Sequence, residues 1–315
     1  MEEAESSGQR TLQAVARQLL ELEPGDRLPT AVELQTQLGV GSGTVQRILK
    51  SLESVKTVTL RARGHLGTYI ETSDVIGLWK AAGLGAPHVA LPPVGSREIL
   101  GIAMALTSEL ERLVSLPTFG YYRGAAARIA RLAESADLTV VSSGAAAHLG
   151  LIDDPMYLTR ELAPNSYYAP GSLVVVSRGG RRSSEPLRVG IDPTSDDHER
   201  LTRAEFADAS AEFVPTDFRR LPVAVLEGEI DTGIWHRVEL LITPEQAGLE
   251  VRPIGRATTK LSTELSTATL VACAATPGAA LLRDIDAAEL VRIADLVVAS
   301  SDTSEFAGPG TARLL

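Results

Sequence analysis

Six hydroxyl, indole and imidazole residues stand where the sequence predicts the ends of strands beyond residue 75. Hydroxyls and the free amides of a helix start form a cradle for a carboxylate or phosphate group, and an indole supplies an apolar wall. We interpret these residues as a binding site for a small anion; the alternative role for the hydroxyls is helix capping. The six residues are Ser142, Ser143, Thr194, Ser195, Trp235 and His236.

The sequence lacks the residue spacings of known catalytic and metal sites. The histidines form no HExxH or HxH pattern, and no GxSxG, P-loop or CxxC motif occurs. The single cysteine, Cys273, rules out an internal disulfide and a multi-cysteine zinc site. Residues 196–199, DDHE, have metal-binding side chains, but acids are also favourable at a helix start, so we interpret them as a solvated helix start. No catalytic residue, metal or cofactor is therefore predicted.

The candidate site needs strands and helices to assemble it. Apolar strands such as SLVVVSR alternate with helices such as SREILGIAMALTSELERL after residue 75, and the last helix is predicted over LLRDIDAAELVRIADLVV. This alternation predicts a mostly parallel α/β domain over residues 75–315. Two clusters of these units, split by the strand at 172–178, predict two lobes with a ligand between them. Residues 121–123, YYR, and Tyr167 with Tyr168 fit either the core or the pocket.

One phrase of this part, LEGEIDTGIWH, resembles a turn and strand of type 2 periplasmic-binding-protein folds. In those folds a helix ends at a glycine, here Gly228, and a strand follows with an aspartate near its start, here Asp231. The resemblance implies a two-lobed domain of the kind that also serves as the effector-sensing part of cytoplasmic regulators.

Charge is distributed unevenly along the chain. The net charge is −10, yet residues 42–65 hold five basic residues and one acid. A small basic face on an acidic protein is typical of a protein with one nucleic-acid-contacting module. The sequence has no apolar run long enough for a membrane helix, and the acidic start MEEAESSGQR is no secretory signal. We therefore expect a cytoplasmic protein without membrane contact.

The first fifty residues predict three helices. Leu12, Val15, Ala16 and Leu19 recur at helical spacing, and two prolines and a glycine in ELEPGDRLP end the first helix. Thr30-x-x-Glu33 forms a capping box for a second helix, which is predicted to end at Gly39. A third helix, with Ser42 or Thr44 as its cap, has an apolar stripe over VQRILKSL.

The following residues predict a basic hairpin. In TVTLRARG apolar residues alternate with Thr59, Arg61 and Arg63, and the turn GHLG leads to the short strand TYIE. Three helices and a hairpin predict a winged helix-turn-helix over residues 1–72. The glycines of LGVGSGTVQR also fit a phosphate-binding loop, but such a loop follows a strand, whereas these follow a helix. A helical corner without any ligand is the second alternative, and the basic hairpin disfavours it.

This region resembles the winged helix-turn-helix of the GntR superfamily of bacterial transcription regulators. The resemblance rests on Leu28-Pro29, Glu33-Leu34, LGV at 38–40, Thr44-Val45 and Gly67-Thr68. GSGTVQ followed by the GHLGT wing is most similar to the YhfZ-type group, whose expected second domain is periplasmic-binding-protein-like. The superfamily commonly has arginine where this chain has Val32, Ser42 and Gln46.

The resemblance implies a DNA contact surface on the third helix and the wing. Gln46 can contact an adenine, and arginines serve the backbone or the minor groove. The expected DNA-binding residues are Thr44, Gln46, Arg47, Lys50, Arg61, Arg63 and His65.

These expectations combine into a metabolite-responsive regulator. It would bind double-stranded operator DNA as a homodimer, because one module contacts too few bases, and a small anion would shift lobe closure. Two alternatives remain: a small-molecule enzyme fused to a winged helix, which turnover would reveal, and a winged helix used for protein contacts, which would not bind DNA.

Overall fold

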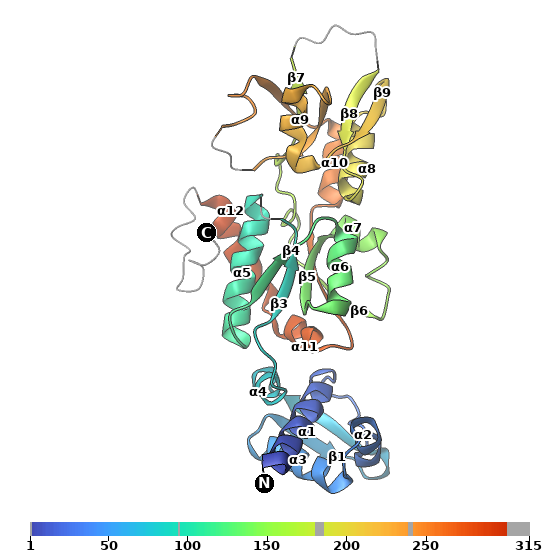
Figure 1. Cartoon of the computed structure of the whole chain (residues 1–315), viewed down its shortest axis with the longest axis vertical. Coiled ribbons are helices and arrows are strands. Elements are labelled where there is room, and N and C mark those ends of the chain that lie inside the picture. Colours follow the sequence, from blue (N-terminus) through green and yellow to red (C-terminus); the bar gives the residue numbers. More distant parts are fainter. Residues whose placement is uncertain (1, 94, 180–185, 239–241, 301–315) are drawn as a thin grey trace.

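A computed structural model describes residues 2–93, 95–179, 186–238 and 242–300. The molecule is elongated, with a small N-terminal part at one end and two α/β lobes in line beyond it (Figure 1). The predicted second domain, residues 75–315, extends past residue 300, and its last fifteen residues, 301–315, lie outside the described residues.

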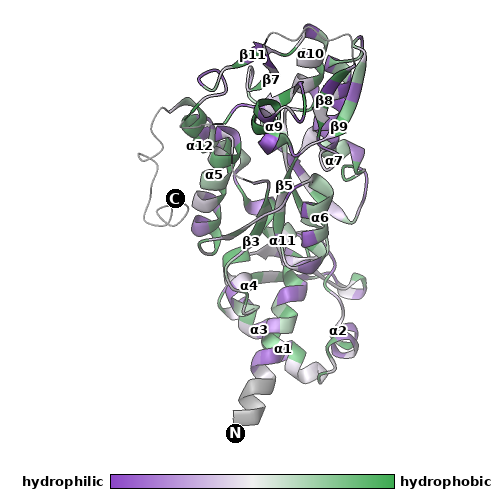
Figure 2. Cartoon of the chain, turned by 45° about the horizontal axis from the view of Figure 1, so that its top comes forward, coloured by the Kyte–Doolittle hydropathy of each residue, from purple (hydrophilic) through white to green (hydrophobic). Residues whose placement is uncertain are grey.

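The N-terminal part is a winged helix-turn-helix, as the sequence predicts. The strands pair antiparallel, and Val15, Leu34 and Val45 pack in its core, each no more than 1% exposed. Figure 2 shows both purple and green turns along the first helix, in which Gln9 is exposed and Leu19 is buried. The elements are α1 (Glu2–Leu20), α2 (Ala31–Leu38), α3 (Ser42–Ser54), β1 (Val58–Ala62), the 3-10 turn η1 (Gly64–Leu66) and β2 (Thr68–Ser73).

Both ends of α2 follow their predicted chemistry. The Thr30 hydroxyl accepts from the Glu33 amide and the Glu33 carboxylate accepts from the Thr30 amide, which completes the capping box. Gly39 ends the helix with φ 63°, a conformation that glycine adopts without strain. The predicted cap of α3 is wrong: Gly41 is the N-cap, and no side chain caps the helix. The Gly41 carbonyl already accepts from the amides of Thr44 and Val45, so the helix begins before either hydroxyl.

The first lobe is assembled from two separate segments of the chain. Its sheet has the order β4-β3-β5-β12-β6, and the red α11 and α12 of Figure 1 lie beside elements formed much earlier in the chain. The first segment supplies β3 (His88–Leu91), α5 (Arg97–Leu113), β4 (Thr118–Tyr121), α6 (Ala125–Glu134), β5 (Leu138–Ser142), α7 (Ser143–His148) and β6 (Tyr157–Glu161), and the second supplies β12 (Ala268–Cys273), α11 (Pro277–Asp284) and α12 (Ala287–Ala299).

The second lobe is inserted between these two segments. Its sheet has the order β11-β7-β10-β8-β9. The prediction that the strand at 172–178 divides the two lobes is therefore wrong. This strand is β7, which lies in the interior of the second sheet. The elements are β7 (Leu173–Arg178), β8 (Leu187–Ile191), α8 (Asp196–Glu205), β9 (Ala211–Pro215), η2 (Phe218–Arg220), α9 (Leu221–Glu227), β10 (Thr232–His236), β11 (Leu249–Pro253) and α10 (Arg256–Glu264).

Both sheets are mixed rather than mostly parallel. In the first lobe β3 pairs parallel with β4 and β5, whereas β12 pairs antiparallel with β5 and β6. In the second lobe β8 pairs parallel with β9 and β10, whereas β7 pairs antiparallel with β10 and β11. The reason is the double crossing of the chain. β12 and β7 enter their sheets at the edge where β5 and β10 end, so they must run in the opposite direction. The result is the two-lobed α/β architecture expected from the resemblance to type 2 periplasmic-binding-protein folds.

The single predicted C-terminal helix is two helices. α11 ends at Asp284, and Asp286 caps α12 by accepting from the amides of Ala288 and Glu289. A capping aspartate inside an apolar pattern starts a new helix, and the pattern alone did not separate the two. None of the helices in the described ranges combines the length and the apolar character that a membrane crossing requires.

A short helix, α4 (Val75–Ala81), connects the winged helix to the first lobe. It packs on α1 and on α11, and Leu78 and Trp79 are buried with the core of the N-terminal part. The Arg283 side chain on α11 also forms an ion pair of 2.7 Å with Glu23, just beyond α1. The N-terminal core thus continues beyond the predicted boundary at residues 72–75 and rests on the first lobe.

Candidate functional site

A cavity of about 410 Å³ lies between the two lobes. Its volume is within the range of about 300–1,000 Å³ typical of small-molecule sites. Residues from β5, α6 and the loop before α5 form one wall, and residues from α8, η2 and β10 form the other. The lobes approach closely here: a Cβ on Gly124 would stand 2.6 Å from the Thr194 carbonyl oxygen of the other lobe. The N-termini of α6 and α8 both open on this cavity, and such ends favour negative charge.

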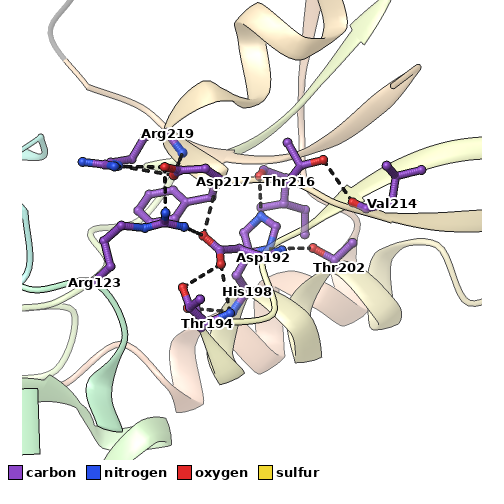
Figure 3. A network of polar contacts seen from close by, with 12 residues as sticks. Arg123, Asp192, Thr194, His198, Thr202, Val214, Thr216, Asp217 and Arg219 are labelled. Atoms are coloured by element: carbon purple, nitrogen blue, oxygen red, sulfur yellow. Dashed lines mark hydrogen bonds and ion pairs between the residues drawn. The ribbon is translucent and has the colours of Figure 1, made fainter. Parts of the chain in front are cut away.

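Arg123 connects the lobes at the rim of the cavity (Figure 3). Its guanidinium, in the first lobe, forms ion pairs with Asp192 at 2.9 Å and Asp217 at 3.0 Å, both in the second lobe. Burial acts to raise the pKa of Asp192, but hydrogen bonds from Thr194, the Phe218 amide and Arg123 lower it overall. Asp192 is therefore held ionised, and the pairs close the lobes on each other.

A second contact between the lobes lies deeper in the cavity. Ser142, at the end of β5, donates its hydroxyl hydrogen to Oδ2 of Asp197 on α8, and Tyr168 donates to the same oxygen at 3.0 Å. Ser142 also caps α7 by accepting from the Ala145 amide. Asp197 is 3% exposed, and burial raises its pKa despite these two hydrogen bonds.

A third contact joins His236 at the end of β10 to Glu98 on α5. The Nε2–Oε1 distance is 3.3 Å, and both side chains are nearly buried. Burial acts to raise the pKa of Glu98, but the hydrogen bond and charge of His236, with the Ala169 amide, lower it to about 2. His236 also packs edge-on against Tyr168.

Arg128 is the most deeply buried cation of the cavity wall. It is 4% exposed and donates to the carbonyl oxygens of Val140 at 2.9 Å and Tyr122 at 3.1 Å, and to the Tyr167 hydroxyl at 3.3 Å. All three acceptors are neutral. Within the described ranges no carboxylate forms an ion pair with it, whereas Arg123 and Arg219 of the same wall pair with aspartates.

The structure brings five of the six residues of the predicted anion site to this cavity. Ser142, Thr194, Ser195, Trp235 and His236 all line it, and Ser195 caps α8 by accepting from the His198 amide. Ser143 is not among the lining residues, because its hydroxyl is exposed and donates to the Glu264 carbonyl at 3.2 Å. The proposed site therefore needs Ser142 rather than Ser143.

The predicted DNA surface is exposed on α3 and the wing. Gln46, Arg47 and Lys50 are exposed on one face of α3, and Thr44 is half-buried near its start. In the wing, Arg61 pairs with Glu71 at 3.7 Å, and the Arg63 guanidinium lies 4.3 Å from the centre of the Tyr69 ring. His65 is exposed in η1, at the tip.

Two protein-family models match the chain. A helix-turn-helix domain model covers residues 23–70, and the model of the YhfZ C-terminal domain covers residues 74–306. The second match spans most of the chain, including both lobes. The chain belongs to the YhfZ C-terminal domain family.

Its relatives fit this family and the two-part organisation. YhfZ of Escherichia coli (strain K12) is 29% identical over 241 residues, 76% of this chain and 78% of that protein. The crystal structure of YhfZ from Shigella flexneri covers 73% of this chain and 97% of its own, with 23% identity and a TM-score of 0.54, and so has the same fold. The HTH-type transcriptional regulator Rv1152 of Mycobacterium tuberculosis is 38% identical over 85 residues, 27% of this chain and 59% of that regulator.

Several cavity residues of this YhfZ-family chain were not predicted. The sequence left open whether Arg123, Tyr167 and Tyr168 lie in the core or in the pocket, and the structure shows that all three line the cavity. Arg128, which also lines it, was not predicted as a site residue. Asp197 and His198 were interpreted as part of a solvated helix start, but both are buried. α8 does begin at Asp196; the helix turns its second and third residues inward. Their only sequence signal was their position directly after a predicted strand end.

Asp197 and His198 do not form a metal site. His198 contacts the Asp192 amide and the Ile234 carbonyl, each with one ring nitrogen, so both nitrogens are engaged in hydrogen bonds. Burial lowers the pKa of His198, which favours the neutral ring. In the described part of the chain no group of three or more His, Cys, Asp or Glu side chains could hold a metal ion.

Proposed function

We propose that this chain is a metabolite-responsive transcription regulator. Its winged helix binds double-stranded operator DNA, and the cavity between its lobes binds a small anionic effector. The observation that carries the proposal is the combination, in one chain, of an exposed helix-turn-helix surface and an interlobe cavity that contains Arg128, a buried cation without a carboxylate partner among the described residues.

The charge of the cavity favours an anion. An unpaired buried charge costs several kcal/mol relative to water, and an oxyanion ligand would offset that cost with charge-assisted hydrogen bonds. Arg128 donates one bond from each of its three nitrogens to a neutral acceptor, so two of its five N–H groups remain for a ligand. Ser142, Thr194 and Ser195 add hydroxyls, and Trp235 and His236 add ring surface to the same site.

The winged helix supplies the DNA contacts. Gln46, Arg47 and Lys50 project from one exposed face of α3, with Thr44 at its edge, and Arg61, Arg63 and His65 follow along the wing. The name of Rv1152 describes that relative as a transcriptional regulator of the helix-turn-helix type, and it supports the same role here. We further propose that this domain belongs to the GntR superfamily.

Effector binding would act through the lobes. A ligand that binds the closed form more tightly shifts the population toward closure. Because α4 and α11 join the first lobe to the winged helix, closure would change the relative placement of two winged helices in a dimer. A homodimer is part of this proposal, since one winged helix reads too few bases for useful specificity. A cytoplasmic location is also part of it.

The domain matches and the regulator relative point to a regulator rather than to the enzyme alternative. No specific feature of the cavity, as formed by the described residues, favours turnover over binding.

The two halves of the proposal are tested separately on the full chain. Selection from random duplex DNA should return one consensus, and Arg47→Ala with Lys50→Ala should abolish enrichment. Thermal unfolding with panels of carboxylates, phosphates and sulfonates should identify anions that stabilise the protein, by about 2.7 kcal/mol at 100 times Kd.

Arg128→Met should remove that anion response. Arg131→Met is the matched control, because Arg131 lies on the same helix but pairs with Glu134 and does not line the cavity. Retention of the response in Arg128→Met, or its equal loss in both variants, would contradict the anion site. Absence of any consensus would contradict the DNA half.

A further inference from the structure

Asp197 is a buried carboxylate in the cavity wall with one oxygen that has no partner. Oδ2 accepts from Ser142 and Tyr168, whereas Oδ1 is inaccessible to solvent and has no hydrogen-bond partner in the described structure. Only 3% of the residue's surface is exposed, so it is more than nine-tenths buried. Buried polar atoms are almost always paired, so this oxygen of a cavity-lining residue indicates a missing donor. It packs against Gly144 of α7, where an added Cβ would stand 2.6 Å from it, so a ligand reaches it as the two lobes separate at this point.

Protonation of Asp197 does not remove its need for a further hydrogen-bond partner. Burial raises the pKa of Asp197, with a smaller opposing influence of the Arg200 charge. A protonated carboxyl would place a hydroxyl group in the wall, and if Oδ1 held it, that donor would lack an acceptor just as the oxygen lacks a donor. The group needs an external partner in either protonation state, and a cationic donor satisfies it best.

The other charged groups of the cavity wall are already matched within the protein. Arg123 and Arg219 pair with aspartates, Asp196 contacts His148, and His236 contacts Glu98. The exceptions among the described residues are Arg128 and Asp197, which form no ion pair with each other or with another side chain. One cavity thus contains a buried cation and a buried carboxylate, each without an ion-pair partner among the described residues.

We propose that the cavity binds a small zwitterion, whose oxyanion pairs with Arg128 and whose primary ammonium group donates to Asp197. This inference rests on the proposed function in that it assigns the anionic end of the effector to the same cavity. It adds a chemical class: amino acids and amino-phosphonates or amino-phosphates, as opposed to simple carboxylates, phosphates or sugar phosphates. A ligand that carries both an ammonium and an oxyanion group compensates both buried groups at once.

The test compares amino compounds with their hydroxy counterparts on the unmodified full chain. The amino probes are glycine, β-alanine, 4-aminobutyrate, 2-aminoethylphosphonate and phosphoethanolamine, and each counterpart has a hydroxyl in place of the amine. Calorimetric titration should find at least one amino probe that binds 10-fold or more tightly than its counterpart. The chain length of the preferred probe then reports the separation of the two charges.

Substitutions test whether Asp197 causes the preference for amino over hydroxy probes. Asp197→Asn should reduce the preference of amino over hydroxy probe to about 1, while Arg128→Met should weaken both. Glu199→Gln, on the same helix but outside the cavity wall, should keep the preference of the unmodified chain. Thermal unfolding without ligand checks that Asp197→Asn folds; if it does not, the amino-to-hydroxy ratio of the unmodified chain still decides.

The outcomes separate this inference from the proposed function. Equal binding of amino and hydroxy probes, or a preference that survives in Asp197→Asn, overturns the zwitterion and leaves the anionic effector in place. No binding by either series also overturns the zwitterion, and the anion panel and the DNA selection then decide the proposed function by themselves.

Discussion

Arg123 and Asp192 belong to different lobes, and an ion pair of 2.9 Å joins them. The same guanidinium binds Asp217 at 3.0 Å, so one side chain of the first lobe holds two loops of the second. The Asp192 side chain is 1% exposed, whereas that of Arg123 is 36% exposed. The buried member of the pair therefore depends on a partner that opening of the lobes would withdraw.

Arg123→Ala should favour the open arrangement. The variant leaves Asp192 with the hydrogen bonds of Thr194 and the Phe218 amide but without its cation, at a cost of about 1–3 kcal/mol. Small-angle scattering should show a larger radius of gyration than in the unmodified chain. Arg203→Ala is the control, because that arginine pairs with Glu199 inside one lobe. Identical scattering of all three proteins would show that the pair does not hold the lobes.

Arg61→Ala combined with Arg63→Ala should weaken DNA binding and flatten its salt dependence. Both residues are exposed in the wing, and each phosphate that the variant no longer neutralises should reduce the slope of log K against log salt by about 0.9. Fluorescence anisotropy over a range of salt concentrations measures this slope. Arg292→Ala, on α12, should leave it unchanged. A double variant with the original slope and affinity would contradict the role of the wing.

Gln46→Ala should relax base preference at one position of each half-site. The residue is exposed on α3, and its amide can form two hydrogen bonds with an adenine, which corresponds to about 1–3 kcal/mol of discrimination. Parallel selections with both proteins measure the effect. The same consensus from both would mean that Gln46 does not read bases.

Ser195→Ala and Ser143→Ala should differ in their effect on a cavity ligand. Ser195 lines the cavity and caps α8, so its variant should lower both ligand affinity and, by about 0.5–2 kcal/mol, the stability of the ligand-free protein. Ser143 donates to the Glu264 carbonyl and is outside the cavity wall, so Ser143→Ala should keep the affinity. Titration of both variants with one anion from the stabilising panel tests this. Equal losses of affinity would contradict the geometry.

Glu98→Gln should destabilise the protein most at neutral pH and progressively less in acid. The pKa of Glu98 falls from 4.5 to about 2 on folding, so the ionised carboxylate contributes stability above pH 4.5. That contribution, up to about 3 kcal/mol, disappears as the pH falls through about 2. Denaturant unfolding between pH 3 and 7 should show the two proteins converging toward acid. A difference that does not vary with pH would assign the effect to packing instead.

Local chemistry made the winged helix predictable from the sequence. The capping box of Thr30 and Glu33, the stop at Gly39 and the change of period at β1 are all short-range signals, and the structure has all three. The cap of α3 was missed, because a glycine carbonyl began the helix without any side chain to mark it.

Longer-range features were only partly predictable. Strand ends identified Ser142, Ser195 and Trp235, since strand ends in two lobes meet at one cleft. Arg128 gave no signal, because its burial depends on carbonyl oxygens of Val140 and Tyr122 that only the folded chain brings together. The return of the chain to the first lobe was also missed, since β12 looks like any apolar strand, and its antiparallel pairing depends on the crossing before it.

The place of β12 in the first sheet has a consequence for protein synthesis. It lies between β5 and β6, more than a hundred residues after either of them in the chain. While the ribosome makes the second lobe, the nascent chain must carry β5 and β6 with their shared neighbour missing, and their unpaired edges are open to wrong partners. The last strand of the winged helix ends at Ser73 and α4 follows at once, but the lobe on which they rest can close only after β12, α11 and α12 have emerged.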